Sequence, residues 1–186
     1  MHLRILYVLP LAAALAAVPA TAQLHLQAGG GATVSPHSSL GTGAHLMGGV
    51  RIETPWRPLS LRVDALAGFA SFSYFGFEPG DPDDTPVRWI DRGMRPILGA
   101  SAGLQLEGRV GPWQPYVFGG LGHYRSEWSR SQPREHDYGV AGGVGVARHV
   151  LGREWFAEAG VSNFGNVFYE RSDTKTIVPL TIGLRW

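Results

Sequence analysis

Apolar and polar residues alternate with a period of two through most of this chain. The C-terminus shows the pattern most clearly, with Ile177, Pro179, Thr181, Gly183 and Arg185 on one face and the apolar series Val178, Leu180, Ile182, Leu184 and Trp186 on the other. A β-strand that turns one face to lipid and the other to a protein interior has this pattern.

Seven further segments alternate in stretches of about ten residues, which is the length of a membrane-spanning strand. They are residues 24–34, 44–53, 59–72, 97–107, 116–124, 138–149 and 155–162. The segment 116–124 is almost apolar on both faces, so its phase stays open. The pattern predicts an all-β fold: an eight-stranded antiparallel up-and-down transmembrane β-barrel.

The segments between these strands alternate in length. The connectors 54–58, 108–114 and 150–154 are short, whereas most of the others are longer: 35–42, 73–95, 125–137 and 163–176. Outer-membrane barrels have short periplasmic turns and longer extracellular loops. We therefore expect both ends of the barrel domain on the periplasmic side.

Aromatic residues gather near both ends of the expected strands. Trp56, Trp113, Trp155 and Trp186 fall at the short-connector end, and the other end carries Tyr74, Phe75, Phe77, Tyr124, Tyr138, Phe164, Phe168 and Tyr169. Amphipathic indole rings prefer the headgroup level of a bilayer. The four tryptophans are therefore predicted membrane-interface residues; the alternative is that they are scattered core residues of a soluble sandwich.

The first 22 residues have the features of a secretory signal peptide. Arg4 precedes an apolar run over residues 5–18, and small residues at 19–22 suit cleavage before Gln23. We expect a signal peptide at 1–22 and an outer-membrane β-barrel domain at 23–186, with an uncleaved anchor as the alternative. Removing Arg4 leaves 15 basic and 15 acidic residues. The predicted mature chain therefore lacks the excess of positive charge that would indicate nucleic-acid binding.

Composition excludes several other classes. The chain has no cysteine, which removes disulfide frameworks and thiolate metal sites. It has 26 glycines without a Gly-X-Y repeat, so it is not collagen-like. No Walker loop, zinc motif or Rossmann fingerprint occurs, and we predict no catalytic, cofactor-binding or metal-binding residue and no cofactor.

The faces opposite the apolar ones are rich in charge. They carry Arg51, Glu53, Arg62, Asp64, Gln105, Glu107, Glu158 and Arg185, together with His25, His45 and His149. An eight-stranded barrel has room inside only for side chains, and buried charges must pair. The eight residues are predicted to form a closed polar plug in which Arg62 and Asp64 are neighbours. Acid–base catalysis or an ion path is the functional alternative.

Glycines on the same faces give the interior space. They are Gly29, Gly31, Gly49, Gly143, Gly145, Gly160 and Gly183. We expect them to make room for the long ionic side chains.

Three segments carry a resemblance to a known family. Residues 115–122 (PYVFGGLG), 155–159 (WFAEA) and 178–186 (VPLTIGLRW) resemble strands of the small OmpA-like, opacity-protein-like outer-membrane β-barrels. The resemblance implies a location in the cell outer membrane and export through the periplasm. It also implies that the last strand (Val178, Leu180, Ile182, Leu184, Trp186) is an assembly signal for the barrel-assembly machinery. The terminal Trp186 stands where Phe is commoner, and the family has no shared catalytic residues.

The resulting functional expectation is a structural or surface-interaction protein, not an enzyme, that acts through its long extracellular loops. One alternative is a lipid A-modifying enzyme of the deacylase type, although no His precedes Ser162 in its strand and His123 with Ser126 is the only other close pair. A narrow channel and a soluble lipocalin-like barrel are further alternatives.

Two charged groups lie on the long-loop side. Four carboxylates at residues 78–84 are more typical of a solvated acidic loop than of a cation site. The arginines are Arg88, Arg92, Arg95, Arg125, Arg130, Arg134 and Arg171. They suit the phosphates of lipopolysaccharide, or they pair with nearby carboxylates. The expected partners are therefore outer-membrane lipid and lipopolysaccharide.

Overall fold

A computed structural model describes residues 23–35, 41–76, 88–126, 135–165 and 175–186. Its eight strands are β1 (Leu24–Val34), β2 (Gly43–Glu53), β3 (Leu59–Gly76), β4 (Arg88–Glu107), β5 (Trp113–Ser126), β6 (Glu135–Val150), β7 (Arg153–Gly165) and β8 (Lys175–Arg185). The predicted signal peptide lies outside the described residues. No helix in the described ranges is long and apolar enough to cross a bilayer.

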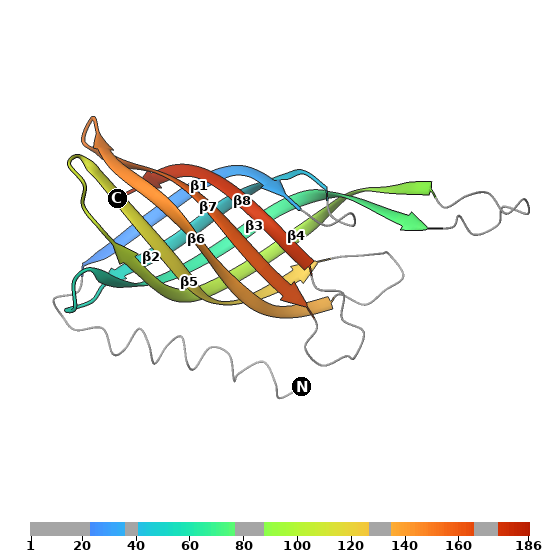
Figure 1. Cartoon of the computed structure of the whole chain (residues 1–186), viewed down its shortest axis with the longest axis horizontal. Coiled ribbons are helices and arrows are strands. Elements are labelled where there is room, and N and C mark those ends of the chain that lie inside the picture. Colours follow the sequence, from blue (N-terminus) through green and yellow to red (C-terminus); the bar gives the residue numbers. More distant parts are fainter. Residues whose placement is uncertain (1–22, 36–40, 77–87, 127–134, 166–174) are drawn as a thin grey trace, which may run out of the picture.

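The strands form a closed antiparallel barrel in which each pairs with its sequence neighbours (Figure 1). β8 completes the closure by pairing with β1, where Gln27 lies opposite Arg185 and Val34 opposite Val178. Closure leaves no free sheet edge in the barrel wall, as a backbone in contact with lipid requires. The predicted fold is confirmed.

Three short turns lie at the end of the barrel where β1 starts and β8 finishes (Figure 1). They are residues 54–58, 108–112 and 151–152. The last is a two-residue turn, with Leu151 at φ 52° and Gly152 at φ 76°. Two successive positive φ angles are typical of the type I′ turn, whose twist matches that of the flanking strands.

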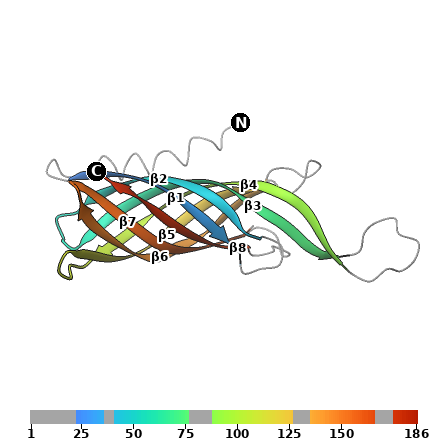
Figure 2. The same cartoon turned by 90° about the horizontal axis from the view of Figure 1, so that it is seen from above.

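The hairpin of β3 and β4 is longer than the alternation predicts. Their pairing continues to Gly76 opposite Arg88, so the expectation of a loop over residues 73–95 is wrong for both of its ends. A register shift between Phe72 and Ser73 interrupts the ladder there. Such a bulge breaks the two-residue period, so the sequence pattern does not predict that the strands continue beyond it. The extended β3–β4 pair projects as a ribbon beyond the barrel (Figure 2).

The barrel wall is apolar outside. Leu46, Leu121 and Ile182 are 64–73 % exposed, while the arginines at positions 51, 62 and 185 are at most 4 % exposed. In β5, whose phase the sequence left open, the inward side chains are Tyr116, Phe118 and Tyr124, and Val117 and Leu121 point outward. Outward apolar side chains and inward side chains therefore alternate along the strands, the pattern that is typical of membrane barrels.

Apolar side chains fill the interior near the long-loop end. The cluster comprises Ala70, Ile97, Tyr124, Phe164 and Ile177, with Leu66 packed against it. The rings of Tyr124 and Phe164 stack with centroids 4.4 Å apart. Tyr124 and Phe164, which the sequence places near the long-loop ends of their strands, therefore point into the interior, because the phase of a residue in its strand decides the direction of its side chain. Phe77, Phe168 and Tyr169 lie outside the described residues.

Candidate functional site: the ionic interior

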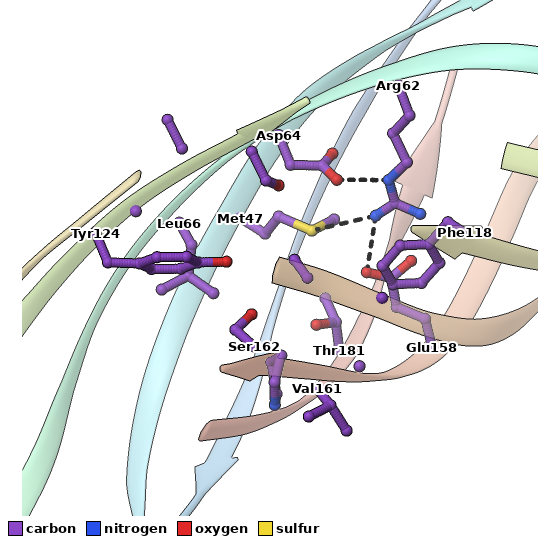
Figure 3. Close-up of a pocket in the computed structure, with 17 residues that line it drawn as sticks. Met47, Arg62, Asp64, Leu66, Phe118, Tyr124, Glu158, Val161, Ser162 and Thr181 are labelled. Atoms are coloured by element: carbon purple, nitrogen blue, oxygen red, sulfur yellow. Dashed lines mark hydrogen bonds and ion pairs between the residues drawn. The ribbon is translucent and has the colours of Figure 1, made fainter. Parts of the chain in front are cut away.

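Arg62 is the centre of the polar interior. Its Nε donates to Asp64 Oδ2 at 2.5 Å, its Nη1 to Gln105 Oε1 at 3.1 Å and its Nη2 to Glu158 Oε1 at 2.9 Å. Figure 3 shows the guanidinium group between Asp64 and Glu158. Because these partners come from β3, β4 and β7, one side chain ties strands on opposite sides of the barrel.

Neutral groups complete the shell around Arg62. Gln27 Nε2 donates to Asp64 Oδ1 at 2.7 Å, and the hydroxyl of Tyr116 donates to Glu158 Oε2 at 3.0 Å. The Phe118 ring centroid lies 4.1 Å from the Arg62 Cζ. Each buried carboxylate thus has both a cation and a neutral donor, the arrangement that offsets loss of hydration.

A second ionic layer lies nearer the short turns. Arg185 Nη1 donates to Glu154 Oε1 at 2.7 Å and to Glu107 Oε1 at 3.3 Å. Arg51 pairs with the same Glu107 oxygen, which also accepts from Gln105 Nε2 at 2.5 Å. Gln105 joins the two layers, because its amide oxygen accepts from Arg62.

The network ends at the short-turn rim. Glu53 accepts contacts from His25 Nε2 at 3.1 Å and Arg57 Nη2 at 3.0 Å. His149 Nε2 lies 3.2 Å from Glu154, but its side chain is 64 % exposed, so His149 sits at the rim. His45 is buried farther from the short turns. Its Nδ1 lies 2.9 Å from the Thr33 hydroxyl and its Nε2 lies 2.8 Å from the Thr181 hydroxyl.

All eight residues predicted for the polar plug point inward, and the structure brings them into one connected set. Gln27, Tyr116 and Glu154 also belong to this connected set, although they were not among the residues predicted for the plug. The phase of their strands identifies Gln27 and Glu154 as inward residues. Gln27 lies two residues after His25 and Glu154 lies four residues before Glu158, so each shares the face of a residue already assigned to the interior. Tyr116 lies in the strand whose phase the sequence left open.

The inward glycines mostly accommodate aromatic rings and neighbouring backbone. A side chain at Gly145 would collide with the Tyr116 ring, and one at Gly183 with the Phe156 ring. Gly49 is the glycine whose missing side chain leaves room for an ionic group, the Asp64 carboxylate. The rings in turn cover the guanidinium groups, since Arg185 Cζ lies 5.1 Å from the Tyr116 centroid and 5.7 Å from that of Phe156.

Substituting Gly145 with Val is expected to destabilise the barrel by about 1–3 kcal/mol, because the new side chain must displace the Tyr116 ring and its bond to Glu158. Urea unfolding of the refolded protein, followed by tryptophan fluorescence, measures this change. Gly48→Ala is the matched control, because a Cβ there meets no heavy atom within 4 Å. Equal midpoints for the two variants would contradict the assigned role of the glycine.

A small cavity separates the ionic layers from the apolar cluster. It has a volume of about 40 Å³, and its lining includes Arg62, Asp64, Tyr124, Glu158, Ser162 and Thr181 (Figure 3). That space suits one or two water molecules. Ser162 is buried and hydrogen-bonds to Tyr124, so this serine does not face lipid. Within the described residues no three His, Asp or Glu side chains are placed to hold a metal ion.

Three solved structures show what this architecture is similar to. Neisserial surface protein A aligns with a TM-score of 0.61 at 16 % identity, covering 88 % of this chain and 97 % of that one. A major outer membrane protein from Thermus thermophilus aligns at 0.56 and 14 %, covering 89 % and 98 %. The outer membrane protein OprG from Pseudomonas aeruginosa aligns at 0.56 and 11 %, covering 88 % and 95 %.

The chain has the fold of the small outer-membrane β-barrels. No family model and no curated protein matches its sequence. At identities of 16 % or less, the likeness is one of fold, and it does not transfer an activity.

Proposed function

We propose that this protein is an integral outer-membrane protein whose closed barrel anchors long surface loops, with a structural or surface-interaction role. The observation that carries the proposal is the separation of the two faces. The outward residues at mid-barrel are apolar and exposed, while the charges are buried within. In water this distribution would expose a large apolar surface; in a bilayer it is the expected one.

Cell fractionation together with a heat-modifiability gel tests the location. We expect the protein in the outer-membrane fraction, and we expect the unheated sample to run differently from the boiled one because a folded barrel resists detergent. Recovery in the soluble periplasmic fraction would overturn the proposal and favour the lipocalin-like alternative.

The two filled regions of the interior support a lumen closed to ions. Ionic side chains occupy the short-turn half, and the cluster around Tyr124 and Phe164 occupies the other end. An eight-stranded barrel filled in this way leaves no water channel. In a planar bilayer the purified protein should give flat current traces, and reproducible single-channel steps would favour the narrow-channel alternative.

The interior charges support a structural role better than a catalytic one. Each carboxylate around Arg62 is bonded to a cation and to a neutral donor, so neither is free to act as a base. The deacylase alternative needs a nucleophile and a base in contact on the lipid side, which Ser162 does not provide. A lipid A acylation assay on membranes with and without the protein, showing no difference, is the expected result.

We propose that the closing strand serves as the signal read by the barrel-assembly machinery. Its outward residues include Leu180, Ile182 and Trp186, which are 46 %, 64 % and 61 % exposed. Trp186→Ala is expected to lower the fraction of heat-modifiable protein in the outer membrane several-fold. Trp56→Ala, an exposed tryptophan at the same end outside the closing strand, is the control, and an equal loss in both variants would contradict the role.

We further propose that the long-loop end meets lipopolysaccharide. Arg88, Arg92 and Arg95 lie on β4, and Arg125 lies on β5, at that end of the barrel, while Arg130, Arg134 and Arg171 lie outside the described residues. Arginine suits phosphate recognition. Photo-crosslinking from position 125 in whole cells should give a lipopolysaccharide adduct, and crosslinks to protein alone would favour another partner.

A further inference from the structure

The three short turns share a chemical pattern at their tips. Each presents a large apolar side chain, and these are the most exposed at this end: Trp56 at 74 %, Val110 at 67 % and Leu151 at 97 %. Each also has an exposed arginine one or two residues away: Arg57, Arg109 and Arg153. We call these six residues the turn-tip surface.

Leu151 is an unusual residue for its position. Its φ of 52° is in the left-handed region, where a branched apolar side chain is strained and where Asn, Asp or Gly is normal. In water this position combines backbone strain with almost complete exposure of a leucine. A surrounding that is itself apolar removes the second cost, so the tip is better suited to an interface than to solution.

The charge of this end is unbalanced. The residues of the three turns include no carboxylate, and the acidic side chains that flank them, Glu53, Glu107 and Glu154, each pair with an interior arginine. Arg57 pairs with Glu53 at 3.0 Å. In the described part of the chain no carboxylate pairs with Arg109 or Arg153, nor with the neighbouring Arg148, which stacks on Trp113 at 4.8 Å.

The depth of the tips matches the membrane interface. Trp155 is the fourth residue after Leu151, an offset that corresponds to at most roughly 10 Å along the axis of a tilted strand. If Trp155 lies at the edge of the hydrocarbon, Leu151 and the other tips lie at the level of the headgroups, a layer comparable in depth.

From these observations we infer that the turn-tip surface is a binding surface for anionic phospholipid in the leaflet on the short-turn side. Trp56, Val110 and Leu151 lie at the level of the headgroups. The arginines that pair with no carboxylate in the described part of the chain, Arg109, Arg153 and the neighbouring Arg148, bind lipid phosphates. The inference rests on the proposed membrane location, and it adds that this end selects its lipid and thereby fixes how deep the barrel sits.

Single-cysteine labelling can test the depth, because the natural chain has no cysteine. The full-length protein carrying Leu151→Cys, labelled with a polarity-sensitive dye, is reconstituted into phosphatidylcholine vesicles with or without phosphatidylglycerol. We expect blue-shifted emission and protection from aqueous iodide when phosphatidylglycerol is present. Emission typical of water with full iodide quenching would overturn the inference.

A second label separates failure of this inference from failure of the proposed location. Leu180→Cys lies on the lipid-facing side of β8 at mid-barrel. If its dye is in hydrocarbon while the Leu151→Cys dye is in water, the barrel is in the membrane and the turn-tip surface is wrong. If both dyes are in water, the membrane location fails as well.

Lipid selectivity is measured with spin-labelled lipids that quench the Leu151→Cys dye. Quenching should favour phosphatidylglycerol over phosphatidylcholine, and Arg109→Gln, Arg148→Gln or Arg153→Gln should each reduce that preference by roughly fivefold at low salt. Arg125→Gln, at the opposite end, should leave it unchanged. Equal quenching by the two lipids, or an effect of Arg125→Gln equal to that of the other three variants, would overturn the assignment to anionic lipid. Either result would favour a protein partner for this surface.

Discussion

Replacing Arg62 with Ala is expected to destabilise the barrel by about 3–5 kcal/mol, the largest effect of any single interior change described above. The substitution removes the shared cation of Asp64 and Glu158 and leaves both carboxylates in a closed interior. Removing one partner of a buried ion pair has this cost because the remaining charge has lost both water and its counter-charge. Urea unfolding in lipid vesicles measures it.

Two controls distinguish this effect from a general loss of charge. Arg57→Ala removes the arginine that pairs with Glu53 and whose side chain is 77 % exposed. The expected loss of stability is below about 1 kcal/mol. The triple variant Arg62→Met, Asp64→Asn, Glu158→Gln removes all three charges together and should recover most of the loss. If the triple variant is as unstable as Arg62→Ala, the buried charge is not the cause.

Replacing Ile182 with Arg is expected to destabilise the membrane-inserted barrel by about 2–4 kcal/mol. Ile182 is 64 % exposed and lies two residues from Leu180, the central residue of β8. A charged side chain on the lipid face near the bilayer midplane costs this much. The free energy of folding into phosphatidylcholine vesicles gives the value.

The same substitution also tests which solvent surrounds the wall. In a water-soluble barrel an exposed arginine would change stability by less than about 0.5 kcal/mol. The control is Leu151→Arg at the turn tip, where a charge near the interface costs about 0–1 kcal/mol. A negligible effect of Ile182→Arg would show that the wall is wetted and would contradict the membrane location.

The strand count and the direction of most side chains could be predicted from the sequence. In β8 the alternation separates Leu180 and Ile182 from Thr181 and Arg185, and the structure places them on opposite sides of the wall. This works because the two-residue period is a local property of an extended chain. It fails in β5, where both faces are nearly apolar, and in the β3–β4 ribbon, where a bulge interrupts the period.

The partners of the interior charges could not be predicted in the same way, with one exception. Arg62 and Asp64 are two residues apart on one strand, so their contact at 2.5 Å follows from local geometry. The contact of Arg62 with Glu158 joins residues 96 positions apart. It depends on how far each strand is staggered against the next and on the tilt that follows from closure, quantities that no single strand encodes.

The sequence by itself determined that eight strands form a barrel with an apolar exterior and a charged interior, because each strand carries its own alternation. The tertiary structure alone decided that the interior divides into ionic layers and an apolar cluster, in which the Tyr124 and Phe164 rings stack. It also decided that aromatic rings lie against inward glycines. Those features depend on side chains that meet across the lumen, and the meeting points are set by the stagger of the closed sheet.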